Sequence, residues 1–303
     1  MKIVFIPKLF LSYINFNIKK TPLLAGYKIT YNCNLKCKHC PFWKINNHKN
    51  PKFSEIKRVL NQLSSSGAKL IIFEGGEPTS WNDGKYTFND ILKYAKRKFL
   101  SVNFTTNGIN GFDFDADAIW VSIDGLEKTH DKIRGKGIFK TVVNNLKEFK
   151  KFSSFFRNKP KIFANICIST ENYREIPLLI ILLNNLVDGF TIQFYYPYEN
   201  NFKFFLPLEK RIKILNKLKE LKRNGYKILN SYSTLDNLKH NTWKCKPEGL
   251  INAEPNGTIN HGCYIKNRGT INCKYCGFAA HVELSKALSL SLPSIMVGMK
   301  IFF

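Results

Sequence analysis

Short apolar runs alternate with amphipathic stretches along the first two thirds of the chain. Residues 54–67 repeat apolar side chains at the i, i+3, i+4, i+7 spacing of a helix, and residues 69–73 form the continuous apolar run of a buried strand. The same reasoning predicts further strands at 27–30, 101–105, 119–123, 161–168 and 190–194. It predicts further helices at 88–97, 139–149 and 173–186. Strands separated by helices indicate an α/β fold with a parallel sheet. The pattern is compatible with a partial barrel and with a doubly wound sheet.

Three cysteines follow the first predicted strand at once. Cys33, Cys37 and Cys40 have the spacing CxxxCxxC. Three thiolates on one loop can hold three corners of an iron-sulfur cube and leave the fourth iron without a protein ligand. A structural zinc site is the alternative, because CxxC pairs are common zinc ligands, but no fourth ligand stands nearby in the sequence.

Polar and glycine-rich residues follow the later strands. The segments after or within the second to fifth strands are Glu74 to Pro78, Thr105 to Gly108, Ser122 to Gly125 and Cys167 to Asn172. Ligands of parallel α/β proteins bind at the carboxyl ends of the strands, so these segments are expected at one rim with the cysteines. Gly75 and Gly76 permit close backbone approach and positive φ, and Pro78 fixes the turn.

This ordered set resembles the radical S-adenosylmethionine (radical SAM) superfamily, and the resemblance extends from about Gly26 to Phe278. The family usually has an aromatic residue before the last cysteine, a place that His39 takes here. The resemblance implies an α/β fold built as a partial (β/α)6 TIM-type barrel. It also implies a 4Fe-4S cluster on Cys33, Cys37 and Cys40 that binds SAM and cleaves it reductively. The resulting 5′-deoxyadenosyl radical abstracts hydrogen from a substrate.

The resemblance also implies where SAM binds. The run Gly75, Gly76, Glu77 and Pro78 is similar to the family's motif for the methionine end of SAM, and Asn107 is a further candidate contact.

Fourth-strand residues complete the expected SAM site. Ser122 and Asp124 resemble the residues that contact the ribose or methionyl end, since a carboxylate can accept from both hydroxyls of a diol. Arg134 is a candidate partner for the SAM carboxylate through its planar fork. The alternative for Arg134 is a surface salt bridge with Asp131.

A second cysteine set stands near the end of the chain. Cys245, Cys263, Cys273 and Cys276 flank a predicted hairpin at 251–259 with Asn-Gly in its turn. The set resembles the twitch form of the SPASM appendage, which implies a small C-terminal cysteine-rich β-hairpin subdomain holding an auxiliary 4Fe-4S cluster. The family has four residues between the glycine and the next cysteine, whereas five separate Gly257 from Cys263. A four-cysteine zinc site is the alternative.

These assignments divide the chain into five expected parts. They are an apolar and basic segment at 1–24, the radical SAM barrel at 25–200, a linking helical region at 201–242, the twitch-like subdomain at 243–280 and an apolar tail at 281–303.

The charge and the composition bear on partners and location. Lys and Arg number 47 against 22 acidic residues, a formal charge of +25, which attracts anionic partners unless it only reflects a biased composition. Eight cysteines without a signal peptide indicate a reducing cytoplasm, with the chain's ends lying on a membrane surface as a further hypothesis. A reduced electron donor such as ferredoxin or flavodoxin is the expected protein partner.

The substrate is the least constrained feature. Peptide-modifying relatives usually carry an N-terminal recognition domain, and the about 25 residues before the first strand are too few for one. This favours a small molecule, a cofactor precursor or, from the apolar ends of the chain, a lipid. A peptide-modifying enzyme with a separate recognition protein is the alternative. A zinc-dependent nucleic-acid-binding protein would leave the motif at Gly75 to Pro78 without a role, so nucleic acid is not favoured.

Overall fold

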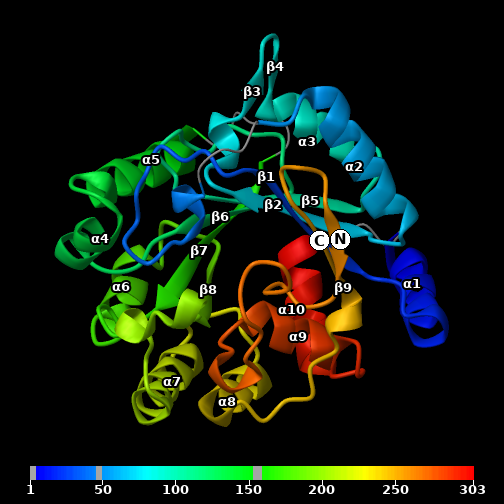
Figure 1. Cartoon of the computed structure of the whole chain (residues 1–303). Coiled ribbons are helices and arrows are strands. Elements are labelled where there is room, and N and C mark those ends of the chain that lie inside the picture. Colours follow the sequence, from blue (N-terminus) through cyan, green and yellow to red (C-terminus); the bar gives the residue numbers. More distant parts are fainter. Residues whose placement is uncertain (1–4, 46–49, 153–158) are drawn as a thin grey trace.

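One curved sheet organises the molecule, in a computed structural model that describes residues 5–45, 50–152 and 159–303. Its strands run in the order β10-β9-β1-β2-β5-β6-β7-β8 (Figure 1). All neighbouring pairs are parallel except β9 with β10. The strands are β1 (Leu24–Thr30), β2 (Leu70–Gly75), β5 (Ser101–Thr106), β6 (Ala118–Ser122), β7 (Lys161–Ile168), β8 (Gly189–Phe194), β9 (Leu250–Ala253) and β10 (Ile259–His261). The six strands predicted from the apolar pattern are all present.

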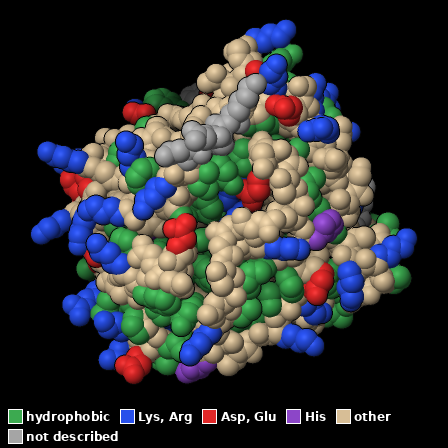
Figure 2. Space-filling model, viewed as in Figure 1, with side chains coloured by type: hydrophobic (Ala, Val, Ile, Leu, Met, Phe, Trp, Pro, Cys, Tyr) green, Lys and Arg blue, Asp and Glu red, His purple; other side chains and the backbone are tan. Residues whose placement is uncertain are grey.

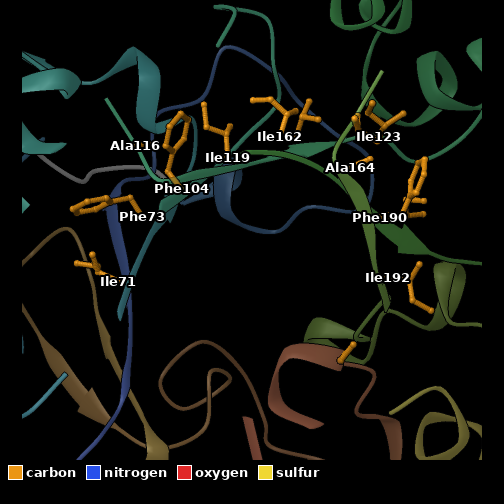
Figure 3. Packing of buried hydrophobic residues seen from close by; sticks show 14 of the residues in the cluster. Ile71, Phe73, Phe104, Ala116, Ile119, Ile123, Ile162, Ala164, Phe190 and Ile192 are labelled. Atoms are coloured by element: carbon orange, nitrogen blue, oxygen red, sulfur yellow. The ribbon is translucent and has the colours of Figure 1, made fainter. Parts of the chain in front are cut away.

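Helices cover the outer, convex face of the sheet. They are α2 (Phe53–Ser65), α3 (Phe88–Lys96), α4 (Glu127–Arg134), α5 (Ile138–Phe152), α6 (Ile176–Leu183) and α7 (Leu208–Arg223). Alternate strand residues such as Ile71, Phe104 and Phe190 point from the strands toward this side, where they form the main core (Figure 3). The expected partial barrel is confirmed. Its sheet curves because twisted parallel strands with helices on one side close toward a barrel.

The inner, concave face is filled at one end by the last helices of the chain. The C-terminal segment forms α8 (Tyr232–His240), α9 (Ala279–Ala287) and α10 (Leu292–Phe302). Ile301 of α10 packs in one cluster with Trp120 and Phe163, which lie on inner-facing strand positions. Thus α10 closes the amino ends of the strands with apolar side chains. The inner face becomes polar toward the carboxyl ends.

The C-terminal hairpin is continuous with the main sheet. The predicted hairpin is present as β9 and β10, and β9 pairs in parallel with β1 from Leu24↔Leu250 to Tyr27↔Ala253. This pairing satisfies the backbone groups of β1 that would otherwise form an open edge. The five-part division of the chain stays a prediction. The expected twitch-like subdomain, 243–280, extends the sheet of the expected barrel, 25–200.

Several elements were not anticipated from the sequence. They include α1 (Phe5–Lys19) and a small two-stranded sheet of β3 (Asn82–Asp83) and β4 (Tyr86–Thr87). The first expected part, 1–24, is helical over α1, and its residues 1–4 lie outside the described residues. Within the described ranges, no helix is both long enough and apolar enough to cross a membrane.

Candidate functional site

The three cysteines of the first set lie together on the loop after β1. The backbone N–H of Cys40 donates to the carbonyl of Cys37 at 3.2 Å, which closes a tight turn between the two. Burial raises the pKa of Cys33 to about 11; the N–H of Leu35 opposes this, and the negative charges of Glu77, Cys37 and Cys40 add to it. The Cys33 thiol is therefore protonated near neutral pH, and metal binding would release its proton.

The glycine pair after β2 is clamped against this loop. Gly76 N–H donates to the carbonyl of Thr30 at 2.7 Å, and Glu77 N–H donates to the carbonyl of Asn32 at 2.9 Å. Gly75 has φ +136°, and a Cβ at Gly75 or Gly76 would come within 2.1 Å of the backbone of Thr30 or Asn32. Only glycine fits here, because the chain segment that leads into the cysteine loop occupies the space of a side chain.

Glu77 joins the glycine turn to the end of β5. Its Oε1 accepts hydrogen bonds from the backbone N–H of Thr79 at 3.1 Å and from the hydroxyls of Thr79 and Thr106 at 2.7 and 2.9 Å. Its Oε2 accepts from Asn107 N–H at 2.8 Å. The Asn107 amide in turn donates to Asn34 Oδ1 in the cysteine loop at 2.7 Å. Glu77 and Asn107 therefore connect the glycine turn, the segment after β5 and the cysteine loop, a structural role that the sequence did not indicate.

Asp124 is the centre of a buried charged cluster beside Cys37. Arg134 Nε donates to its Oδ2 at 2.6 Å, and Cys167 N–H donates to its Oδ1 at 3.0 Å. Burial alone would raise the pKa of Asp124, but the cation of Arg134 and the nearby His39 and His130 hold it below its ordinary value. The carboxylate is therefore ionised at neutral pH.

Arg134 reaches the cysteine loop as well. Its side chain is 10% exposed, and Nη1 lies 3.9 Å from Cys37 Sγ. Asp131, the partner in the surface alternative, instead accepts from the backbone N–H groups of Gly137 and Phe139. The surface salt bridge with Asp131 is therefore wrong, because α4 points the guanidinium inward.

His39 and Ser122 complete the rim. The His39 ring meets Tyr195 and Phe204 edge-on, and its Nε2 lies 3.7 Å from Asp124 Oδ2. Burial lowers the pKa of His39 to about 4, so the ring is neutral. Ser122 is half-buried on the same strand face as Trp120, which places it on the inner side of β6.

A second charged cluster was missed by sequence reasoning. Lys28 Nζ donates to Glu74 Oε2 at 2.8 Å, and Tyr264 Oη donates to the same oxygen at 2.7 Å. Arg268 Nε donates to Glu254 Oε1 at 2.6 Å. We call Lys28, Glu74, Glu254, Tyr264 and Arg268 the inner ion network. Its one sequence signal was a lysine within an apolar strand, because the other members come from distant segments.

The four cysteines of the second set also gather in space. Burial raises the pKa of Cys276 to about 12, and the nearby charges of Cys263, Cys245 and Cys273 contribute. Cys245 and Cys273 are exposed, and all eight cysteines of the chain are free thiols. Arg211 is buried beside this set and donates through Nη1 to the carbonyl of Cys276 at 3.2 Å.

A family model for the radical SAM superfamily matches residues 27–183. The chain belongs to the radical SAM superfamily. Members of this superfamily use a 4Fe-4S cluster and SAM. The family match favours this assignment over a zinc-dependent nucleic-acid-binding protein.

Radical SAM relatives with curated names match part of the chain. Fe-coproporphyrin III synthase of Methanosarcina barkeri is 29% identical over 181 residues, covering 56% of this chain and 43% of that protein. The sporulation killing factor maturation protein SkfB of Bacillus subtilis is 28% identical over 167 residues, covering 51% and 38%. The chain thus spans less than half the length of these relatives.

Solved structures agree on the fold. Streptococcus suis SuiB bound to S-adenosylmethionine aligns with a TM-score of 0.66 and 15% identity, covering 95% of this chain and 68% of that one. The native anSMEcpe structure with bound AdoMet aligns with a TM-score of 0.60, covering 91% and 82%. At this identity the likeness concerns the fold of the radical SAM barrel.

The residues at the rim fit the cofactors of the family. Among the described residues, no three Cys, His, Asp or Glu side chains are arranged to hold a single metal ion. A 4Fe-4S cube differs from such a site because separate iron atoms carry its ligands. Cys33, Cys37 and Cys40 supply three neighbouring reduced thiols. The clamped glycine turn and the ionised Asp124 provide backbone and carboxylate groups for a zwitterionic nucleoside.

Proposed function

We propose that the chain is a radical SAM enzyme that cleaves SAM reductively and abstracts hydrogen from a substrate. The observation that carries the proposal is the assembly of the cysteine loop, the glycine turn and the Asp124–Arg134 pair at the carboxyl ends of β1, β2 and β6. When bound, the cluster and SAM would supply the electron and the 5′-deoxyadenosyl radical.

The roles of the chain's residues follow from their positions. Cys33, Cys37 and Cys40 would bind three irons, and the backbone of the turn at Gly75 to Pro78 would position the methionine end of SAM. Ser122 and Asp124 would face its ribose or methionyl end. Among the described residues each Asp124 oxygen accepts one hydrogen bond, and a carboxylate oxygen has room for a second. Arg134 would pair with the SAM carboxylate, as the sequence predicts, and would also hold Asp124 ionised and place a cation beside Cys37.

Anaerobic reconstitution tests this proposal. Protein supplied with iron, sulfide and dithionite should convert SAM to 5′-deoxyadenosine, and Cys37→Ala should abolish that product. Cys167→Ala is the matched control, because Cys167 is a half-buried thiol near Asp124 that lies outside the cysteine loop. Clusters without any 5′-deoxyadenosine in the wild-type protein would contradict the proposal.

We also propose an auxiliary 4Fe-4S cluster on Cys245, Cys263, Cys273 and Cys276, with zinc as the alternative. Four neighbouring free thiols support it, because they can complete the ligand shell of a closed cluster. Iron, sulfide and zinc are measured in anaerobically purified wild type and Cys245→Ala. Zinc that disappears in the variant while iron stays unchanged would establish the alternative.

The names of the relatives support two substrate classes. A small molecule or cofactor precursor is supported by the match to a protein named Fe-coproporphyrin III synthase. A peptide presented by a separate recognition protein is supported by matches to SkfB and to the mycofactocin maturase MftC of Mycolicibacterium smegmatis. Deuterium transfer into 5′-deoxyadenosine, measured with deuterated small molecules and with deuterated peptides, separates the two.

The electron donor is a further proposal. A ferredoxin or flavodoxin would be attracted by the +25 charge, and Lys and Arg side chains surround much of the face in Figure 2. Rates supported by flavodoxin should then fall as salt rises, whereas rates with dithionite should not.

We propose that the protein works in the cytoplasm and makes a peripheral membrane contact. Phe10 and Ile18 of α1 are exposed apolar residues, as are Leu292 and Met296 of α10, and these segments also carry lysines. A lipid substrate would be consistent with this contact. Flotation with anionic liposomes tests the contact, and protein that stays at the bottom at low salt would contradict it.

A further inference from the structure

The inner ion network lies between the apolar closure made by α10 and the rim that carries the cysteine loop. Lys28 and Glu74 share the inner strand face with Leu24 and Leu70, which pack against Phe302 at the amino ends of the strands. Toward the rim, Lys28 Nζ lies 4.1 Å from the ring centre of Phe42, two residues after Cys40. The network is therefore part of the wall that faces the proposed SAM site.

The Nε edge of the Arg268 guanidinium is hydrogen-bonded, whereas its Nη1–Nη2 edge has no hydrogen bond to any described residue. Its Nε donates to Glu254, and its guanidinium lies over the Tyr264 ring at 4.1 Å from the centre. Arg268 is held in this position by a tight turn, in which its N–H donates to the carbonyl of Ile265 at 2.8 Å and Asn267 has φ 64°. Among the described residues, neither Nη1 nor Nη2 has a hydrogen-bond partner, although the side chain is only 1% exposed.

The nearest acidic group does not satisfy this edge. Nη1 lies 3.9 Å from Glu74 Oε1, a distance for electrostatic attraction that is too long for a hydrogen bond. Both oxygens of Glu254 are engaged, one by Arg268 and the other by Tyr31. Buried guanidinium N–H groups without acceptors are costly, and such groups usually have an explanation in a ligand, ion or water.

We propose that the Nη1–Nη2 edge of Arg268 binds a carboxylate group of the substrate. The inference rests on the proposed function, because it takes the inner face beside the SAM site as the substrate pocket. A carboxylate matches the planar, two-donor edge of a guanidinium better than any other common anion of single charge. Tyr264 and Glu254 hold that edge in place before the substrate arrives, so little ordering is left to occur on binding.

Local charge selects a monoanion over a dianion. The cations of Lys28 and Arg268 are paired with the carboxylates of Glu74 and Glu254, so the formal charges of the network sum to zero. One added carboxylate would leave a single net negative charge near four unused N–H donors. A phosphate dianion would bring twice that charge into a buried site, which is far more costly. The ring of Phe42 beside the network and the ring of Tyr264 within it suit an apolar body attached to the carboxylate.

Binding of small probes tests the site without knowledge of the substrate. Phenylacetate, its neutral amide and phenyl phosphate are titrated calorimetrically into anaerobically reconstituted full-length protein, with and without SAM. Wild type should bind phenylacetate about tenfold or more tightly than the amide, the usual effect of hydrogen bonds to a charged group. Arg268→Gln should reduce the ratio to less than about twofold, and Arg268→Lys, which keeps the charge but loses the fork, should give an intermediate value.

Arg223→Gln is the matched control, because Arg223 is an exposed arginine at the end of α7. It should keep the wild-type ratio. The inference would be overturned by wild type that cleaves SAM but shows no preference for phenylacetate, by tighter binding of phenyl phosphate, or by Arg268→Gln weakening SAM itself tenfold. Preference for phenylacetate in protein that holds clusters but never cleaves SAM would overturn the proposed function and leave the carboxylate site standing.

Discussion

The two cysteine sets differ in what surrounds their thiols. The first set comes from a single loop, and the guanidinium of the buried Arg134 directly approaches the sulfur of Cys37. The second set is spread over residues 245–276 and leaves Cys245 and Cys273 exposed, and its buried Arg211 donates to the backbone carbonyls of Tyr275 and Cys276. Three thiols leave one iron of a cube without a protein ligand, which suits a cluster that reacts, whereas four thiols suit one that is closed.

The largest expected effect separates the two sets by activity. Cys33→Ala should lower 5′-deoxyadenosine formation more than about 100-fold, because even the loss of outer groups around a metal ligand costs about 10–100-fold. Cys263→Ala should keep SAM cleavage within about threefold while total iron falls by about half, since each proposed cluster holds four irons. Equal loss of activity in both variants would show that the sets do not work independently.

The arginine beside the first set should matter next. Arg134→Gln removes the N–H donor to Asp124 Oδ2 and the cation near Cys37. SAM cleavage should fall about tenfold, as expected for a group that orients a metal ligand, and the KM for SAM should rise. Lys132→Gln is the control, because that exposed lysine of the same helix pairs with Glu171. Unchanged kinetics in Arg134→Gln would contradict the role assigned to the Asp124 cluster.

The arginine beside the second set should act on stability. Arg211 donates to the carbonyls of Leu206 at 3.1 Å, Cys276 at 3.2 Å and Tyr275 at 3.5 Å. Arg211→Met leaves these carbonyls without their donor, so the free energy of unfolding should fall by about 2–3 kcal/mol. Metal bound by the second set should be lost before that of the first. Urea unfolding with parallel iron analysis measures both, and Arg223→Gln should match wild type.

The smallest expected effect is a pH dependence from His281 of α9, whose ring meets Phe278 two residues after Cys276 of the second set. Burial lowers the pKa of His281 to about 4, below its ordinary value of 6.5. As pH falls from 6.5 toward 4, the unfolded chain takes up this proton before the folded one, so stability is lost in that window. His281→Phe should reduce the loss between pH 7 and pH 5 by about 2 kcal/mol. Urea unfolding at both pH values checks this, and His240→Gln, an exposed change, should leave the loss unaltered.

The sequence alone predicted what depends on local patterns. The strands β1, β2, β5, β6, β7 and β8 and the C-terminal hairpin were recognisable because apolar runs, helical spacing and an Asn-Gly turn act over a few residues. The cysteine spacing and the glycine turn were equally visible, and the family match to residues 27–183 confirms the assignment that they suggested.

Only the tertiary structure decided how distant segments meet. It joined β9 to β1, turned Arg134 inward to Asp124, and brought Arg268, which follows β10, to the inner ion network beside β1 and β2. Contacts between residues so far apart in sequence depend on packing and charge pairing in three dimensions. Such contacts produce no periodic pattern of residues along the chain from which they could be predicted. For this reason the chemistry of the rim could be predicted from motifs, whereas the inner ion network could not.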